Sequence, residues 1–140
     1  MTDKPWKATE RRIAAYLETE RNPLSGGNGK QTRSDTLHPA LFIEIKHGSG
    51  CPKTWSAIVK LFRDTARLAA IERKVPVLVL HRKGSRGVEN DDAYFELTDG
   101  EIQLQAGPVV CAPLSELKAI FRVLYAEVRV DSEASERWRA

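Results

Sequence analysis

Cysteine and long hydrophobic runs are both scarce in this chain of 140 residues. Its two cysteines, Cys51 and Cys111, lack C-x-x-C partners, which argues against a zinc site and against a disulfide scaffold. The longest strongly apolar stretch, Val75 to Leu80, is far shorter than the roughly 18–20 residues of a membrane span. The polar N-terminal residues also lack the apolar centre of a signal peptide. We therefore expect a soluble, cytoplasmic protein that does not associate with a membrane.

Enough apolar residues remain to build one hydrophobic core. They make up 41% of the chain, whose length suits one domain rather than two. We expect a single domain over residues 1–130, followed by a polar and frayed tail over residues 131–140.

Charge is divided unevenly between the two parts of the chain. Residues 1–86 carry 17 basic and 8 acidic side chains, a net charge of +9, whereas residues 87–140 carry 5 and 11, a net charge of −6. A basic first part favours a polyanionic partner such as nucleic acid. Chance clustering on an ordinary polar surface is the alternative.

Hydrophobic periodicity predicts an α/β fold. Helices are expected from between Pro5 and Thr9 to about Glu20, from Thr54 to about Arg73 and from about Ser115 to Val130. Strands are expected over residues 32–36, 41–47, 75–81, 94–97, 101–105 and 109–111, with a hairpin turn at residues 99–100. Because residues 75–81 are apolar on both faces, they should form a central strand. This order predicts a central mixed sheet flanked by helices, with a C-terminal hairpin and helix.

Charged side chains interrupt the otherwise apolar strand expected at residues 41–47. Because successive strand residues point to opposite faces, Phe42, Glu44 and Lys46 share one side. A carboxylate isolated on a buried face is unfavourable unless it is paired or binds a metal. An ion pair on an edge strand that faces water is the alternative interpretation of Glu44 and Lys46.

Two further acids are predicted near Glu44. Glu10 precedes the apolar residues of the first helix at helical spacing and so continues their stripe, unless it is only a first-turn acid favoured by the helix dipole. Asp35 shares the face of Glu44 if the loop between the first two strands has an even number of residues, and takes the opposite face if that number is odd. The sequence leaves the loop length open.

Three acids and a lysine in one partly buried place favour a divalent cation. Mg²⁺ takes one or two protein carboxylates together with waters and the phosphate oxygens of a substrate. Such an ion polarises a phosphoryl group and supplies hydroxide, and a lysine beside it can orient the attacking water. The residues therefore predict metal-assisted hydrolysis of a phosphodiester.

Asp35 followed by Glu44-Ile45-Lys46 on a hairpin strand resembles the core motif of the PD-(D/E)xK nuclease superfamily. Within that superfamily, Glu10 on the leading helix and Ser25-Gly26-Gly27 before the aspartate are similar to the archaeal-type and phage Holliday junction resolvases. The resemblance covers residues 8 to 83, and Ser34 stands where the superfamily pattern has proline. It implies a restriction-endonuclease-like αβββαβ core.

The resemblance also implies roles for these residues. Asp35 and Glu44 would bind Mg²⁺, for which Mn²⁺ would substitute, Glu10 would complete the metal site, and Lys46 would assist the water. Ser25 would lie near the scissile phosphate. A homodimer would hold two active sites across a branched DNA, in recombination or repair, in a bacterial or archaeal cell or encoded by a phage.

Small and basic side chains are the candidates for contact with DNA. They are Ser25, Gly26, Gly27, Lys30, Arg33, Lys53, Lys60 and Arg63. The glycines would allow close approach of a phosphate backbone, whereas a flexible connector and a solvated helix face are the alternatives. The second helix also offers Lys60, Arg63 and Asp64 as a further catalytic residue, and the sequence does not choose among them.

We therefore expect a Mg²⁺-dependent, structure-selective DNA endonuclease, most similar to a Holliday junction resolvase, that hydrolyses phosphodiester bonds in branched DNA. A nickase, a flap or mismatch endonuclease, or a restriction-type enzyme of the same superfamily is one alternative. A non-catalytic DNA-binding protein with a nuclease-like fold is another, because the basic first part of the chain would serve it equally well.

Overall fold

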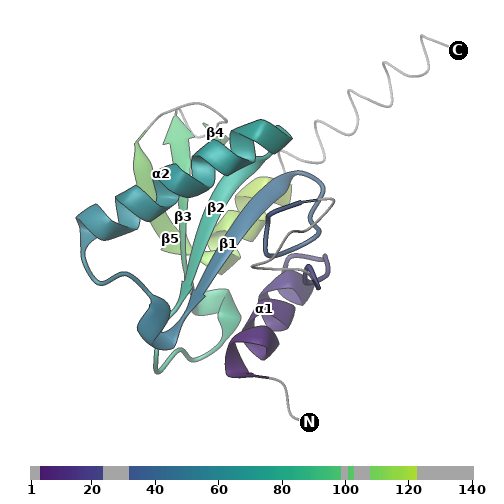
Figure 1. Cartoon of the computed structure of the whole chain (residues 1–140), viewed down its shortest axis with the longest axis vertical. Coiled ribbons are helices and arrows are strands. Elements are labelled where there is room, and N and C mark those ends of the chain that lie inside the picture. Colours follow the sequence, from purple (N-terminus) through teal and green to yellow (C-terminus); the bar gives the residue numbers. More distant parts are fainter. Residues whose placement is uncertain (1–3, 24–31, 99–100, 103–107, 123–140) are drawn as a thin grey trace, which may run out of the picture.

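The computed structural model of the chain describes residues 4–23, 32–98, 101–102 and 108–122. Helix α1 spans Pro5–Tyr16 and α2 spans Trp55–Glu72, and residues 114–122 form a third helix. The strands are β1 (Leu41–His47), β2 (Val75–His81), β3 (Asp92–Thr98), β4 (Glu101–Ile102) and β5 (Val109–Pro113), with short 3-10 helices η1 (Gly48–Gly50) and η2 (Val88–Asn90). The predicted α/β class is confirmed: helices flank a mixed sheet (Figure 1).

The sheet has the strand order β1-β2-β3-β4, and β5 pairs with β3. β1 runs parallel to β2, in a register that pairs Glu44 with Leu78 and His47 with His81. The pairs of β3 with β2, β4 and β5 are antiparallel. Because β1 and β2 are parallel, their carboxyl ends lie together, which is where α/β sheets commonly bind ligands.

The two faces of the sheet pack against different helices. On one face, strand residues that include Ile43, Ile45, Val77 and Val79 form a core with Ile13 and Leu17 near α1 and with Leu114 and Leu117 of the third helix. On the other face, Leu78 and Leu80 pack with Ile58 and Phe62 of α2. Glu44 and Lys46 therefore belong to the α2 side of β1, through their pairing with Leu78 and Leu80.

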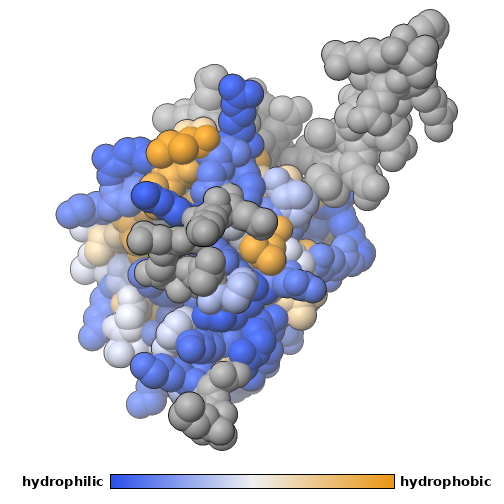
Figure 2. Space-filling view, turned by 45° about the vertical axis from the view of Figure 1, so that its right-hand side comes forward, coloured by the Kyte–Doolittle hydropathy of each residue, from blue (hydrophilic) through white to orange (hydrophobic). Residues whose placement is uncertain are grey.

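The side of the molecule formed by α1 and the edge of β1 has a mostly hydrophilic surface (Figure 2). Within the described residues, no helix is both long enough and apolar enough to cross a membrane. The hairpin turn predicted at residues 99–100, the helix beyond residue 122 and the tail over residues 131–140 lie outside the described residues.

Helix α1 ends at Tyr16, whereas the sequence predicted an end near Glu20. The N–H groups of Glu18 and Thr19 donate to the C=O groups of Ala15 and Ala14, at 3.0 and 2.9 Å, and Glu18 has a φ of 61°. This is a Schellman ending, in which a left-handed residue satisfies the last carbonyls. The prediction missed it because that left-handed residue is usually glycine and here is a glutamate.

Helix α2 matches its prediction at both ends. The Thr54 hydroxyl accepts the N–H of Ala57 at 3.2 Å, and Arg73 ends the helix in the left-handed conformation, with a φ of 56°. A side chain other than glycine costs about 1–2 kcal/mol in that conformation.

We expect Arg73→Gly to stabilise the protein by about 0.5–1 kcal/mol, because glycine relieves the left-handed strain. Part of this gain is lost, because the unfolded chain with glycine has more conformational entropy to lose on folding. Urea denaturation measures this free energy of unfolding. Arg73→Ala is the control, since it removes the same exposed side chain and keeps the strain. Equal stabilities for the glycine and alanine variants would contradict the assignment.

Residues 32–36 do not form the predicted strand, and only an isolated bridge joins Thr36 to Arg21. Along the edge of β1, side-chain hydrogen bonds supplement the backbone bond from the N–H of Asp35 to the C=O of Ile43. The Ser34 hydroxyl accepts the N–H of Ile43 at 2.8 Å, and the Asp35 carboxylate accepts the N–H of Ile45 at 2.7 Å. Serine and aspartate compete in this way with regular backbone ladders, and the strand prediction did not include that competition.

Candidate active site

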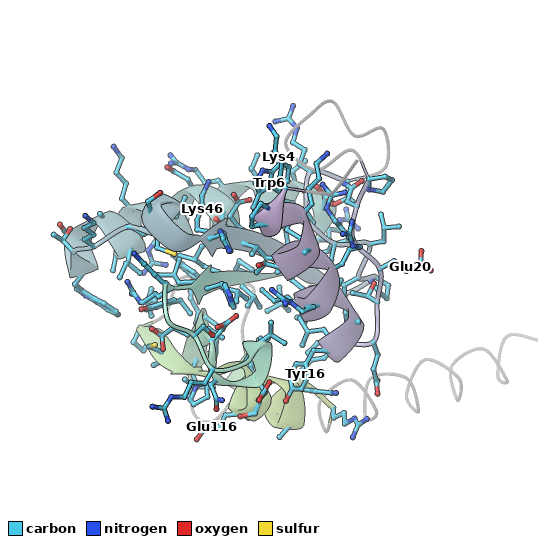
Figure 3. All side chains as sticks on the ribbon, turned by 90° about the horizontal axis from the view of Figure 1, so that it is seen from below. Lys4, Trp6, Tyr16, Glu20, Lys46 and Glu116 are labelled. Atoms are coloured by element: carbon cyan, nitrogen blue, oxygen red, sulfur yellow. The ribbon has the colours of Figure 1, made fainter. Side chains whose placement is uncertain are left out.

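Glu10, Asp35, Glu44 and Lys46 line one cavity of about 440 Å³. Helix α1 supplies Glu10, the segment before β1 supplies Asp35, and β1 supplies Glu44 and Lys46. Trp6, Ile45, His47 and Ser49 complete the lining. In Figure 3, Lys46 of β1 lies beside Trp6, which belongs to the first turn of α1. Three segments that are separate in the sequence therefore bring three carboxylates and an ammonium group to one place.

Glu44 is the carboxylate most affected by this environment. Burial, together with repulsion from Asp35, raises the pKa of the Glu44 carboxyl from its ordinary value of 4.5 to about 7. Lys46 opposes this rise in pKa, with its Nζ 3.3 Å from Glu44 Oε1, and Glu10 adds a smaller repulsion. The cavity therefore concentrates negative charge that a cation would neutralise.

Asp35 is held firmly beside β1. Its carboxylate accepts the N–H of Ile45, its own N–H donates to the C=O of Ile43 at 2.8 Å, and its C=O accepts the N–H of Asn22 at 2.9 Å. Asp35 and Glu44 line the same cavity, although residues 32–36 do not form the strand on which the predicted shared face depended.

Two residues missed by the sequence prediction hold the segment around Asp35. The Asn22 side chain, 4% exposed, donates to the C=O groups of Thr32 and Ser34 at 3.1 and 3.0 Å. Glu72, at the end of α2, accepts the Thr32 hydroxyl and, at 3.1 Å, the N–H of Arg33. Asn22 precedes a proline and Glu72 ends a helix, and these local roles are enough to account for both residues in the sequence. The sequence therefore gives no sign of their hydrogen bonds to a distant segment.

Glu10 reaches the cavity from the buried face of α1 and is 5% exposed. The Nε of Arg21 donates to Glu10 Oε2 at 2.8 Å, and the Arg21 guanidinium lies 5.5 Å from the centre of the Trp6 ring. The sequence gives no sign of a role for Arg21 or Trp6, because each has its partner in a different segment. Arg21 reduces the repulsion between Glu10 and the other two acids.

The predicted DNA contacts are only partly placed. Ser25, Gly26, Gly27 and Lys30 lie outside the described residues. Arg33, Lys53 and Lys60 are exposed, and none of them lines the cavity. These three side chains therefore lie on the surface outside the cavity.

Arg63 has a structural partner. Its Nη1 donates at 2.8 Å to Glu96 of β3, which is 2% exposed. Arg67 pairs with Asp64. The three candidates on α2 for a further catalytic residue, Lys60, Arg63 and Asp64, therefore do not line the cavity.

The side chains at the cavity suit a hard divalent cation. Carboxylate oxygens are the protein ligands that Mg²⁺ takes, and one or two are enough because waters and phosphate oxygens complete its shell. Among the described residues, no three His, Cys, Asp or Glu side chains are arranged as a ready-made cage for a metal. Asp35 and Glu44 thus fit a site that a substrate phosphate would complete.

No family model matches the chain, and no curated protein or solved structure matches it either.

Proposed function

We propose that the protein is a Mg²⁺-dependent endonuclease that hydrolyses phosphodiester bonds in branched DNA, such as a four-way junction. The observation that supports this most is that Glu10, Asp35, Glu44 and Lys46 line one cavity. These are the residues whose order resembles the PD-(D/E)xK nucleases. The proposal includes their αβββαβ core, in which residues 34–36 would replace a regular strand beside β1.

The positions of the residues support the roles that the resemblance implies. Asp35 and Glu44 would hold the cation. Glu10, which is paired with Arg21, would complete the metal site. When bound, the cation would neutralise phosphate charge and activate a water. Lys46 extends from β1 beside Glu44 and is partly exposed, so its ammonium group can hold the attacking water or a phosphate oxygen. Water would add its oxygen to phosphorus and a proton to the leaving 3′-oxygen, giving 5′-phosphate and 3′-hydroxyl ends.

The surface and charge of the chain support a DNA substrate. The side that carries α1 is mostly hydrophilic, and residues 1–86 have a net charge of +9. Exposed Arg33, Lys53 and Lys60 offer cations for contact with phosphates. We include a homodimer in the proposal, because a symmetric junction requires two matched cuts and twofold pairs are the commonest oligomers.

Incubation with a mobile four-way junction and Mg²⁺ tests this function. We expect the wild type to cleave the junction, and Asp35→Asn to lower the rate on the order of 100-fold or more. Glu116→Gln is the matched control, because this exposed acid lies in the third helix, away from Lys46 (Figure 3). Equal cleavage by the wild type and Asp35→Asn would overturn the proposal. A flap and a linear duplex, run in parallel, separate a junction resolvase from a flap nuclease or a restriction-type enzyme.

A non-catalytic DNA-binding protein is the second candidate. Glu10 already pairs with Arg21, and Glu44 already pairs with Lys46. Both carboxylates therefore have a cationic partner without a metal ion, which favours this candidate. Calorimetry with Mn²⁺ separates the two candidates: a nuclease takes up the ion in a way that Glu44→Gln weakens, and a pure binding protein does not. The salt dependence of DNA binding cannot separate them, since phosphate contacts produce it in both.

A further inference from the structure

A second cavity, of about 580 Å³, lies between α1 and the segment that joins β2 to β3. Its polar lining consists of Arg12 and Tyr16 from α1, His81 at the end of β2, and Ser85 and Glu89 from the connecting segment. These residues have no role in the proposed catalysis.

The second cavity adjoins the carboxylate cavity. Helix α1 contributes to both, with Glu10 in the first and Arg12 in the second. The imidazole of His47, which lines the first, stacks on that of His81, which lines the second: the ring centres are 5.3 Å apart and the planes differ by 11°. A ligand that spans this histidine pair would therefore reach both cavities.

His81 is oriented by a buried carboxylate. Asp91 is 3% exposed, and its Oδ2 lies 2.7 Å from His81 Nδ1, while its Oδ1 accepts the Ser85 hydroxyl at 2.6 Å. Because a carboxylate only accepts, Nδ1 carries its hydrogen toward Asp91, and Nε2 is left for a ligand. Nε2 has no hydrogen-bond partner among the described residues. Ser85 bonds to Asp91 instead of to His81, so this is not a serine nucleophile activated by histidine.

The charges around His81 favour an anion with one opposing group. Arg12 is exposed and always cationic, and protonated His81 would donate through Nε2 while Asp91 offsets its charge. His47, stacked on His81, is the other titratable group beside it. Glu89 opposes an anion, although its carboxylate is folded so closely onto Gly87 that a β-carbon there would overlap it.

We propose that Arg12 and His81 form a phosphate-binding site. In the complex with DNA, the site would hold a backbone phosphate next to the one at the carboxylates, because the two cavities adjoin at the histidine pair. This assignment to DNA rests on the proposed function, whereas the phosphate site does not. The site would position the strand and would take no part in breaking the bond.

Titration with inorganic phosphate in metal-free buffer, followed by the NMR shifts of the His81 ring, tests the site. We expect a saturable shift whose midpoint Arg12→Ala raises about three- to tenfold and Glu89→Gln lowers by a similar factor. Both side chains are exposed, so we expect these variants to keep the fold. Substitution of His81 is less suitable, because His81 pairs with buried Asp91. Arg11→Ala, one residue earlier on α1 and outside the cavity, is the control. A shift that does not saturate, or that Arg12→Ala leaves unchanged, overturns the site.

Binding of the four-way junction without divalent metal tests the assignment to DNA. We expect Arg12→Ala to weaken binding and Glu89→Gln to tighten it, by about the same factors as for phosphate. If phosphate binding responds to these changes and junction binding does not, the assignment to DNA is wrong. Glu44→Gln distinguishes the two proposals: it should leave the phosphate titration intact, and phosphate binding would persist even if the wild type cleaved no DNA.

Discussion

Glu44→Gln is expected to abolish cleavage and, in metal-free buffer above pH 7, to make the protein more stable than the wild type. Removal of one proposed metal ligand should slow cleavage on the order of 100-fold or more. The gain in stability comes from the same environment, because the glutamine does not have to ionise beside Asp35 in a buried cavity.

The pH dependence of this gain follows from the raised pKa of Glu44. The folded protein keeps the proton until about pH 7, whereas the unfolded chain releases it near the ordinary pKa of 4.5. The contribution of Glu44 to wild-type stability should therefore fall as the pH rises from 4.5 to 7. Glutamine does not titrate, so the difference in favour of Glu44→Gln should grow across this window and level off above it, at about 1–3 kcal/mol after allowance for partial exposure.

Urea denaturation between pH 4.5 and 8.5, in the presence of a chelator, measures this difference. Glu116→Gln is the control for the same chemical change at an exposed position, outside the carboxylate cavity. Added Mg²⁺ should then stabilise the wild type more than Glu44→Gln, because a ligand that binds only the folded state adds to its stability. A variant less stable than the wild type above pH 7 would show that the three acids do not repel one another.

The sequence predicted the parts of this fold that local patterns encode. The alternation of residues 41–47 placed Glu44 and Lys46 on one side of a strand, and the helical stripe directed Glu10 inward. The apolar run of residues 75–81 was predicted as a central strand, and the structure has it between β1 and β3. In the first two cases, burial of an apolar face fixes the position of the charged residue next to it.

The remaining parts depend on pairs that are distant in the sequence. Arg21 with Glu10 and Arg63 with Glu96 are ion pairs between different segments, and no local spacing reports them. Asp35 could be placed only conditionally, because its segment forms no regular strand. It is held by backbone bonds to Ile43 and Asn22 and by its side-chain bond to Ile45. Such bonds form when the tertiary structure brings the partners together, so periodicity carries no signal for them.

Ser34→Ala is expected to destabilise the protein by about 1–3 kcal/mol and to slow cleavage, although Ser34 does not line the cavity. Its hydroxyl accepts the buried N–H of Ile43 at 2.8 Å and that of Thr36 at 3.3 Å, and it donates to the C=O of Ile43 at 3.2 Å. Alanine leaves the Ile43 N–H without this acceptor and loosens the segment that carries Asp35. Ser34 would thus be a positioning residue.

Comparison with Asp35→Asn separates positioning from chemistry. Asparagine keeps an oxygen that can accept the N–H of Ile45, so Asp35→Asn should fold with near wild-type stability and lose cleavage almost completely. Ser34→Ala keeps the carboxylate, so it should lose stability and only part of the cleavage rate, with a lower kcat and a smaller change in KM. Amide hydrogen exchange at Ile43 should become faster in Ser34→Ala and stay slow in Ser115→Ala, a control at an exposed serine of the third helix. If Ser34→Ala left both stability and exchange unchanged, Asp35 would have to be held by its backbone contacts to Ile43 and Asn22 alone.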